Sequence, residues 1–482
     1  MKFLLGIFPK KKINIFISYF FLGTLLALCF DPFNIPFLSL LIIGTFFILN
    51  EYVSKKFTNI FSNYFFCGIL FGFGFFLTSM HWISNSVLQL DKNLYYIVPL
   101  ILFFFPLLMS LFFGFMQLAN AYLWSNSNAK IFYFSSIWII FEFLRSTLFT
   151  GLPWNLIGYS WSWSLSYSQS VSFLGIYGLG LLTVFCSIGI FSLIIDKKNK
   201  IFFLISVVIL FFLYLYGNNR ITHSITNFTN NEVRIVHTAF DQDEKWLNES
   251  IMKTKSMGSN ELITIFPESS FGFYSEMPEN YVSGYIRNDG KKYFNSIKFR
   301  GYVYDKRILV PFGEFTPFSK YLFFIFPNNR LINNSLSKGA KHQEFPGNIS
   351  PLICYEAIFP SYVRSNLSNE TEILINISND SWFGENSGPK QHFTHSRFRS
   401  IELGIPMVRS SNKGYSGLIS PNGEIIELIN TNEITFTDVK IPQRLETTFF
   451  REYGNFLAYF LIVLFFIIGY AINLKSIKIK HE

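Results

Sequence analysis

Residues 351–356, with the sequence PLICYE, are an apolar run that ends in a thiol and a carboxylate. The run predicts a short buried strand that ends at a loop, where α/β domains often carry reactive side chains. Cys354 is the one cysteine in the polar part of the chain, because Cys29, Cys67 and Cys186 lie in long apolar runs. A lone cysteine is most often a buried structural thiol. A nucleophilic role for Cys354 would need a base and an oxyanion-stabilising group elsewhere in the chain.

Composition indicates a membrane protein that carries one polar domain. Half of the residues are hydrophobic, 61 are phenylalanine and 15% are charged, whereas about 25% are charged in ordinary soluble domains. Most Asp and Glu residues fall between residues 218 and 455, a region long enough for a domain with its own core. The net charge of +9 lies largely in short lysine clusters between apolar runs. This distribution favours a role in membrane topology over nucleic-acid binding.

A bilayer-spanning helix needs about 20 mostly apolar residues, and the sequence predicts eight such segments. They are residues 13–30, 35–53, 60–80, 94–118, 131–149, 171–195, 201–216 and 456–474. If all eight span the membrane, the lysine clusters fall on one side, and the positive-inside rule then places both termini in the cytoplasm. The polar region between the last two segments is then extracytoplasmic. The basic start leads into an apolar run without a small-residue cleavage site, so we expect no removed signal peptide.

These patterns divide the chain into three parts: a transmembrane bundle of seven spans over residues 1–217, an extracytoplasmic domain over 218–454, and a final span with a basic tail over 455–482. Within the bundle, Glu142 and Arg145 are three residues apart and share one helix face. Charges at membrane depth usually face a protein interior or a wet cavity. We therefore interpret the two residues as a structural ion pair, with contact to a lipid headgroup as the alternative.

Glu268, Lys306 and Cys354 each fall at the end of a predicted strand in the polar domain. Strands alternate there with a few helical pieces, which predicts a layered α/β domain, and such domains collect catalytic groups at strand ends. A thiol with a pKa of about 8.5 needs a base to take its proton or a cation to stabilise the thiolate. Glu268 has the chemistry of the base, and Lys306 that of a cation that could also face an oxyanion. Spacing alone is a weak signal for such a trio.

Four ordered motifs resemble those of the nitrilase superfamily, and more narrowly those of its membrane-embedded branch, the apolipoprotein N-acyltransferases. They are residues 267–269 (PES), 304–314 (YDKRILVPFGE), 353–356 (ICYE) and 378–384 (SNDSWFG). The eight apolar segments, the Glu142 and Arg145 pair and residues 150–154 (TGLPW) are also similar to that family, as is the run over residues 391–414. The resemblance therefore covers nearly the whole chain.

The resemblance implies a transmembrane bundle with a four-layer αββα domain. It also implies transfer of a fatty acyl chain from a glycerophospholipid, typically phosphatidylethanolamine, to the α-amine of a lipoprotein whose N-terminal cysteine bears diacylglycerol. The reaction would pass through a thioester, and the formation of an amide from it is downhill, so we expect no cofactor, metal or ATP. The implied location is the inner membrane, with a periplasmic catalytic domain. We expect a monomer that does not bind nucleic acid.

By position, the resemblance makes Cys354 the acylated nucleophile, Glu268 the base and Lys306 the oxyanion partner. Four further residues match supporting or substrate-facing positions of the family: Glu314, Tyr355, Glu356 and Trp246. The sequence departs from the family after the Glu268 strand, where the usual helix is reduced to about residues 275–281. Strands are expected next at residues 282–286 and 295–299.

Other interpretations compete for individual residues and for the whole chain. His392 and His395 suggest a metal site, but two histidines at this spacing without an evident third ligand rarely make one, so a structural role is preferred. An aromatic loop beside Glu314 is either core or a lid that touches lipid; it comprises Phe315, Phe318, Tyr321, Leu322, Phe323, Phe324 and Phe326. A membrane-tethered amidase for small amides would not need so long an anchor. A catalytically dead scaffold would have lost at least one of the acid, lysine and cysteine.

Overall fold

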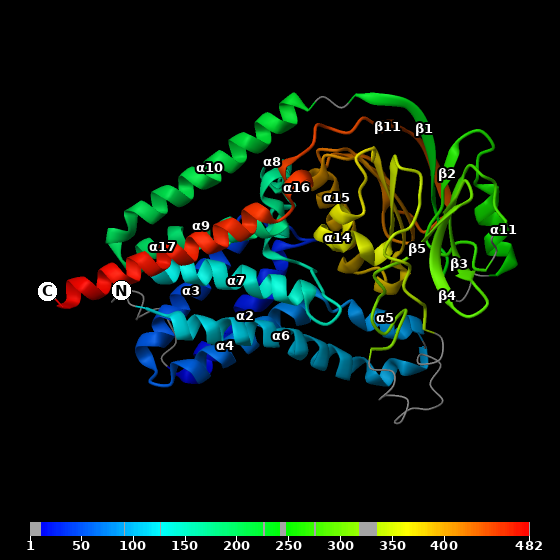
Figure 1. Ribbon diagram of the computed structural model, residues 1–482. Coiled ribbons are helices and arrows are strands. Elements are labelled where there is room, and N and C mark those ends of the chain that lie inside the picture. The colour runs from blue at the N-terminus through cyan, green and yellow to red at the C-terminus, as the bar shows by residue number, and fades with distance from the viewer. Residues whose placement is uncertain are drawn as a thin grey trace. The chain divides into compact units, whose positions relative to one another are not determined.

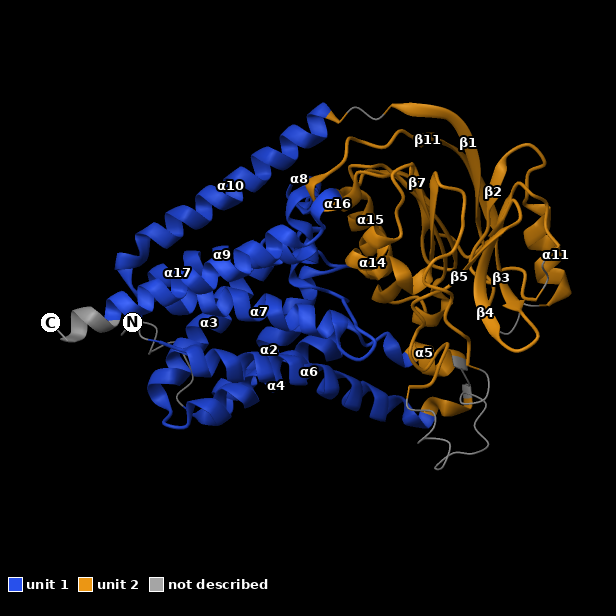
Figure 2. Ribbon diagram, viewed as in Figure 1, with its two compact units in different colours: residues 1–84, 96–223, 452–482 blue, residues 85–95, 224–451 orange. Residues whose placement is uncertain are grey.

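The computed structural model describes residues 11–90, 92–125, 127–224, 227–241, 247–273, 276–317 and 335–481. The chain forms two compact units, coloured separately in Figure 2. The first, which we call the helical unit, comprises residues 1–84, 96–223 and 452–482. The second, the sheet unit, comprises residues 85–95 and 224–451.

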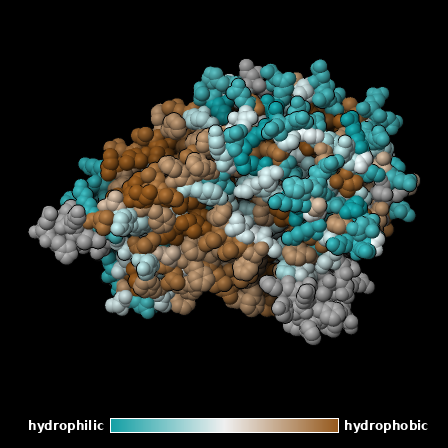
Figure 3. All heavy atoms as spheres, in the orientation of Figure 1, coloured by the Kyte–Doolittle hydropathy of each residue, from teal (hydrophilic) through white to brown (hydrophobic). Residues whose placement is uncertain are grey.

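Long apolar helices make up the helical unit (Figure 1). Their bounds are α2 (Lys12–Leu26), α3 (Leu38–Lys56), α4 (Ile60–Ser79), α6 (Val98–Leu123), α7 (Ala129–Thr147), α9 (Val171–Ile195), α10 (Lys200–His223) and α17 (Phe456–His481), with a short α8 (Leu165–Ser168) between α7 and α9. Apolar side chains cover most of the visible face of this unit, whereas hydrophilic ones dominate that of the sheet unit (Figure 3).

Within the described residues, seven helical segments are long and apolar enough to cross a membrane. Each corresponds to one of the predicted spans, so the chain is a membrane protein with several apolar helices. The remaining predicted span, at residues 131–149, is α7. This helix carries three charged residues, Lys130, Glu142 and Arg145, all buried. An eighth span at α7 stays a prediction.

Glu142 and Arg145 are buried as expected, but each binds the backbone of the following loop instead of the other side chain. Arg145 Nη1 donates to the carbonyl oxygens of Leu152 and Trp154, at 2.8 Å each. Glu142 Oε1 accepts the backbone N–H of Ile157 at 2.9 Å. The expectation of a direct ion pair is therefore wrong. The charges satisfy backbone groups that the break after α7 would otherwise leave unpaired, which is costly inside a membrane protein.

The sheet unit contains two sheets in its described residues. The six-stranded sheet has the order β11-β1-β2-β3-β4-β5, and the five-stranded sheet the order β10-β9-β8-β7-β6. The strands of the first are β1 (Phe228–His237), β2 (Ile263–Ile265), β3 (Tyr281–Asn288), β4 (Tyr293–Phe299), β5 (Tyr302–Asp305) and β11 (Thr435–Pro442). Those of the second are β6 (Ile349–Ile353), β7 (Ile373–Asn379), β8 (Met407–Asn412), β9 (Ser416–Ile419) and β10 (Ile425–Ile429).

Parallel strands form the centre of each sheet. β1, β2 and β3 run parallel in the first, with Ile265 opposite Val282. β6, β7 and β8 run parallel in the second, with Ile353 opposite Ile377. β6, β7 and β8 are buried along their whole length, and β3 along most of it, which is typical of parallel strands covered on both faces. The hairpin predicted over residues 407–420 is present as the antiparallel pair β8 and β9.

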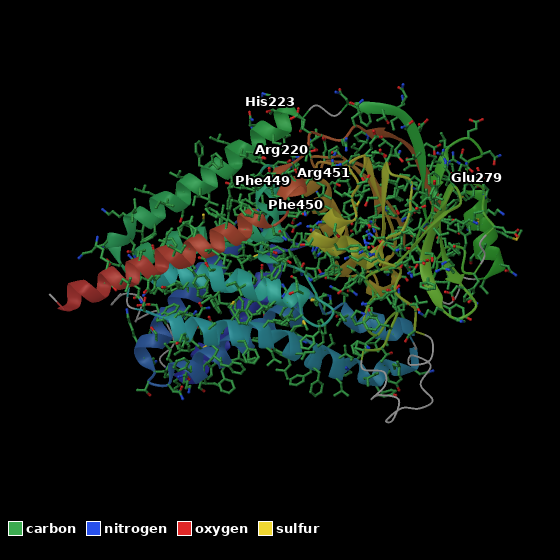
Figure 4. All side chains as sticks on the ribbon, viewed as in Figure 1. Arg220, His223, Glu279, Phe449, Phe450 and Arg451 are labelled. Carbon is green, nitrogen blue, oxygen red and sulfur yellow. The ribbon has the colours of Figure 1, made fainter. Side chains whose placement is uncertain are left out.

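Three apolar clusters show that the sheet unit has four layers. The first lies between the sheets and combines residues such as Ile265 and Ile297 with Ile353 and Ile377. The second packs the five-stranded sheet on α14 (Pro360–Ser365), α15 (Ser387–Leu403) and α16 (Phe449–Tyr453); Phe450 on α16 belongs to it (Figure 4). The third packs the six-stranded sheet near α11 (Asn248–Ser256). The predicted αββα architecture is confirmed.

The reduced helix expected at residues 275–281 is absent from the described residues 276–281. Residues 276–278 have no regular structure, and β3 already begins at Tyr281. Pro278 lacks a backbone N–H and fixes its own φ, which disfavours a helix that would have only two turns. The strands expected at 282–286 and 295–299 are confirmed as β3 and β4.

Candidate active site

Cys354 directly follows β6, at the start of the short 3-10 segment Cys354–Ile358. Its φ of +49° is in the left-handed region, which is uncommon for a residue with a side chain. The residue is 6% exposed and belongs to the apolar cluster between the two sheets. Such backbone strain is retained when the surrounding structure over-determines it, and it concentrates at functional sites.

Lys306, at the end of β5, binds two carboxylates. Its Nζ lies 3.2 Å from Glu268 Oε1 and 2.9 Å from Glu314 Oε1. Asn295 on β4 donates its Nδ2 to the same two oxygens, at 2.6 Å to Glu268 and 2.9 Å to Glu314. Lys306 is 1% exposed and Glu268 5% exposed, so their attraction is little screened by water. The fold thus brings Glu268, Lys306 and Glu314 into one buried cluster.

The charges of this cluster act on Cys354. Burial alone would lower the pKa of Lys306, but Glu268, Glu314 and Cys354 outweigh it and raise that pKa well above its usual range. Burial and the Glu268 charge raise the pKa of Cys354 to about 12, against a lowering effect of Lys306. At neutral pH the site therefore holds a charged ammonium beside a protonated thiol. The Cys354 thiol must therefore lose its proton to a base as it reacts, because little free thiolate is present at neutral pH.

Glu356 ties the strand end that carries Lys306 to the one that carries Cys354. Its Oε2 accepts the backbone N–H of Ile353 at 2.8 Å, and its Oε1 accepts that of Arg307 at 2.7 Å. Tyr304 donates its hydroxyl to the same carboxylate at 3.0 Å. Burial raises the pKa of Glu356, and the backbone hydrogen bonds oppose that shift. Glu356 is thus placed to fix the spacing of the cluster.

The structure describes some of the remaining predicted site residues. Tyr355 is buried beside Cys354, and its ring meets that of Phe359 edge-on at 5.1 Å. Burial raises the pKa of Tyr355. Trp246 lies outside the described residues. Within the predicted aromatic loop, Phe315 is described and its carbonyl accepts the N–H of Phe312 at 2.7 Å, whereas residues 318–334 lie outside the described part of the chain.

Two contributors were not singled out by the sequence. Asn295 was expected only as the start of a strand; its signal was a polar side chain in an otherwise buried run. The second is a buried network behind Cys354, in which His392 Nδ1 lies 3.0 Å from Asp380 Oδ1. Arg409 donates from Nη2 to Asp380 Oδ2 at 2.8 Å. Asp380 lies in one of the quoted motifs, but no contact between it and Arg409 follows from the sequence.

Cys354, Asp380 and His392 offer ligand-type atoms that lie within 4.8 Å of one another. The sequence grouped His392 with His395 instead. A metal there would have to compete with the Arg409 guanidinium, which already binds Asp380 and lies 3.1 Å from His392 Nδ1. The donor set is thus occupied by contacts within the protein, and we assign no metal to it.

Two facing sheets between helices, with a buried acid, lysine and cysteine at strand ends, define a protein of the carbon-nitrogen hydrolase class. The family model described as carbon-nitrogen hydrolase matches residues 243–448, and the one described as the apolipoprotein N-acyltransferase N-terminal domain matches residues 22–189. The chain belongs to the apolipoprotein N-acyltransferase family. It is an acyltransferase of lipoprotein biosynthesis, and the amidase interpretation is not favoured.

Similar curated proteins support this family assignment. Apolipoprotein N-acyltransferases of Rickettsia prowazekii and Rickettsia typhi are each 34% identical over 94% of this chain, covering 97% and 98% of their own lengths. That of Wigglesworthia glossinidia brevipalpis is 30% identical over 97% of this chain and its whole length. Among solved structures, an amidase of the nitrilase superfamily from Nesterenkonia aligns with 45% of this chain and 93% of its own, at 14% identity and a TM-score of 0.31.

Proposed function

We propose that Cys354 is the acyl-carrying nucleophile, with Glu268 as the base and Lys306 as the oxyanion partner. The observation that carries this proposal is the buried ammonium of Lys306, held by Glu268 at 3.2 Å and Glu314 at 2.9 Å and electrostatically coupled to the Cys354 thiol. Preorganised positive charge in a dry site stabilises a developing oxyanion much better than water does. A carboxylate beside it can accept the thiol proton as the bond to carbon forms.

The first step transfers an acyl group to the enzyme. Cys354 Sγ attacks the ester carbonyl of a glycerophospholipid, phosphatidylethanolamine in our proposal, and Glu268 takes the thiol proton. The carbonyl oxygen becomes negative beside Lys306. The C–O bond then breaks, Glu268 returns the proton to the leaving oxygen, and a lysophospholipid departs. A thioester on Cys354 remains, and atoms and charge balance without a cofactor.

The second step transfers the acyl group to the lipoprotein. The α-amine of a diacylglyceryl-cysteine attacks the thioester carbonyl and gives its proton to Glu268. The C–S bond breaks, and the proton passes to Cys354. The product is an amide, which is more stable than a thioester, so this step runs downhill. Glu314, Tyr355 and Glu356 support the groups that react, and Trp246 is proposed to face the substrate.

We also propose the membrane arrangement. The chain is a monomer of the inner membrane with both termini in the cytoplasm, three parts bounded at residues 217 and 454, and the sheet unit on the periplasmic side. The lysine clusters between the apolar segments support this orientation. An epitope inserted at the exposed turn of Gly290 and Lys291 should be accessible to antibody in spheroplasts. A tag at residue 482 should need detergent.

The deciding experiment is the intact mass of the purified protein after incubation with phosphatidylethanolamine. We expect an added fatty-acyl mass that hydroxylamine releases. Cys354→Ala should lack the adduct, and Cys186→Ala, a matched change of a buried thiol in the helical unit, should retain it. An adduct that survives in Cys354→Ala would overturn the assignment of the nucleophile. A folded wild-type protein without any adduct would overturn phosphatidylethanolamine as the donor.

A further inference from the structure

His392 on α15 joins the backbone of Cys354 to two buried charges. Its Nε2 lies 3.2 Å from the carbonyl oxygen of Cys354. Its Nδ1 lies 3.0 Å from Asp380 Oδ1 and 3.1 Å from Arg409 Nη2. All of these side chains are buried, and Phe383 meets the imidazole edge-on at 5.6 Å. The ring is therefore fixed on several sides.

These contacts select one tautomer of His392. The Cys354 carbonyl is only an acceptor, so Nε2 must carry a hydrogen to bind it. Arg409 is only a donor, so it can bind Nδ1 when that nitrogen has its lone pair. Burial and the Arg409 charge lower the pKa of His392, against the effect of Asp380, which favours the neutral ring. The neutral ring with hydrogen on Nε2 satisfies both contacts. Asp380 Oδ1 and Nδ1 are then both acceptors, and Arg409 Nη2 lies between them, at 3.0 Å from Oδ1 and 3.1 Å from Nδ1.

We propose that His392 is a positioning residue, which holds the nucleophile by donating its Nε2 hydrogen to the carbonyl of Cys354. This inference rests on the proposed role of Cys354. The hydrogen bond restrains the peptide that follows a residue with φ of +49°, at the point where the backbone turns out of β6. The direction of the Cys354 side chain depends on that backbone, and a small misplacement of a reacting atom is costly in rate.

The same contacts argue against two rival roles for His392. A general base needs a lone pair aimed at the thiol, but the lone pair on Nδ1 faces Arg409, and Nε2 carries the hydrogen. A metal ligand likewise needs a lone pair that is not already accepting a hydrogen bond. Asp380 and Arg409 are the charged groups that face the ring. Arg409 donates to the lone pair of Nδ1, and Asp380 binds the same guanidinium. The imidazole is thus placed to orient the nucleophile, not to exchange its proton.

The test compares His392→Gln with His392→Asn. A glutamine amide nitrogen can reach the place of Nε2 and still donate to Cys354, whereas the shorter asparagine cannot. We expect His392→Asn to slow formation of the Cys354 thioester by about tenfold to a hundredfold with an unchanged KM for phospholipid, and His392→Gln to recover most of the rate. His395→Gln, a matched change of the other buried histidine of α15, should retain the wild-type rate.

The pH dependence of Cys354 alkylation by iodoacetamide separates positioning from base catalysis. Positioning predicts the same midpoint in wild type, His392→Gln and His392→Asn. A shifted midpoint, or a glutamine variant no faster than the asparagine variant, would overturn the proposal. Nitrogen-15 NMR of the histidine-labelled wild type needs no variant, and a ring protonated on Nδ1 alone would overturn it too. Failure of the proposed function is distinguishable from failure of the His392 proposal, because wild type would then form no Cys354 thioester at all.

Discussion

The Glu314 carboxylate bridges the Lys306 ammonium and the backbone of the loop that follows it. Oε1 lies 2.9 Å from Lys306 Nζ, and Oε2 accepts the N–H of Val310 at 2.8 Å. Glu268 contacts the same ammonium at 3.2 Å. Lys306 thus contacts two carboxylates. Glu314 is also hydrogen-bonded to the backbone, whereas Glu268 lies just after the end of β2. This arrangement supports the proposed role of Glu268 as the base, because Glu314 can keep Lys306 charged and in place while Glu268 changes protonation.

Glu314→Gln should slow thioester formation by about tenfold to a hundredfold, because it removes charge that keeps Lys306 ionised and positioned toward the oxyanion. Glu314→Ala should be slower still, since it also releases the Val310 N–H. The measurement is the single-turnover rate of the Cys354 adduct. Glu279→Gln is the matched control. Glu279 is an exposed glutamate of the sheet unit, labelled in Figure 4, and its substitution should leave the rate unchanged. A Glu314→Ala variant as fast as wild type would refute the supporting role.

Alkylation of Cys354 and acyl transfer should respond in opposite directions to Glu268→Gln. The negative charge of Glu268 contributes to the raised thiol pKa of about 12. Its removal lowers that pKa, so a larger fraction is thiolate at pH 9 and iodoacetamide should react faster. Acyl transfer should fall by about a hundredfold or more, because the proposed base is gone. Both rates are measured on the purified protein, with alkylation located by peptide mass.

Lys306→Met tests the opposite charge in the same alkylation and acyl-transfer experiment. The Lys306 charge lowers the pKa of Cys354, so its loss should raise the pKa and slow alkylation at pH 9. Acyl transfer should be lost as well, since the proposed oxyanion partner is missing. Two variants without transfer but with opposite alkylation rates would show that both charges act on one thiol. Equal alkylation rates in the two variants would contradict the geometry of the site.

Gly284 on β3 marks a close approach to the strand end that carries Glu268. A Cβ there would lie 2.6 Å from the carbonyl oxygen of Pro267 and 2.7 Å from the N–H nitrogen of Ser269. Gly284→Ala should therefore displace Glu268, destabilise the protein by about 1–3 kcal/mol and slow thioester formation by about tenfold or more. Gly313→Ala is the control, because its nearest neighbour would be 3.4 Å away. A Gly284→Ala variant with wild-type rate and melting temperature would contradict this account.

Much of the fold follows from short-range patterns in the sequence. The strands around Ile265 and Ile353 were predicted because apolar runs of that length end in polar, turn-forming residues, and their local signal agrees with the tertiary structure. Seven spans follow from length and hydropathy. The segment of α7 was predicted as an eighth span in the same way, and this stays a prediction because Lys130, Glu142 and Arg145 weaken its apolar signal. The burial of these charged residues depends on contacts with residues distant in the chain.

From the sequence, only those site residues that lie in a recognisable motif could be predicted. Glu268, Lys306 and Cys354 lie at strand ends, and the order of motifs suggested that they meet. Contacts between distant residues could not be inferred: Asn295 reaches across to Glu268 and Glu314, and Arg409 pairs with Asp380 from a neighbouring strand. The expected pairing of Glu142 with Arg145 failed for the same reason, because helical spacing says nothing about the backbone carbonyls of the next loop.

Asp380 and Arg409 should make the sheet unit sensitive to acid. Burial opposes ionisation of Asp380, but opposing contributions, of which the Arg409 charge is the largest, outweigh it and lower the pKa of Asp380 to about 2. Since the folded pKa lies below an unfolded value of about 3.9, the stabilisation is present above about pH 4 and is lost as pH falls toward 2. It amounts to about 2.6 kcal/mol. Thermal unfolding of the purified protein from pH 7 to pH 3 should therefore show a falling melting temperature that is less steep in Asp380→Asn.

The two residues should also be strongly coupled to each other at neutral pH. Asp380→Asn leaves the buried Arg409 without its carboxylate, and Arg409→Met leaves the buried Asp380 without its cation, so each should cost about 3–5 kcal/mol. The double variant leaves no uncompensated charge and should cost clearly less than the sum of the two. Denaturant unfolding of all four proteins measures that coupling. Additive effects would mean that the 2.8 Å contact of Arg409 with Asp380 contributes no mutual stabilisation, and the network behind Cys354 would then be held by packing alone.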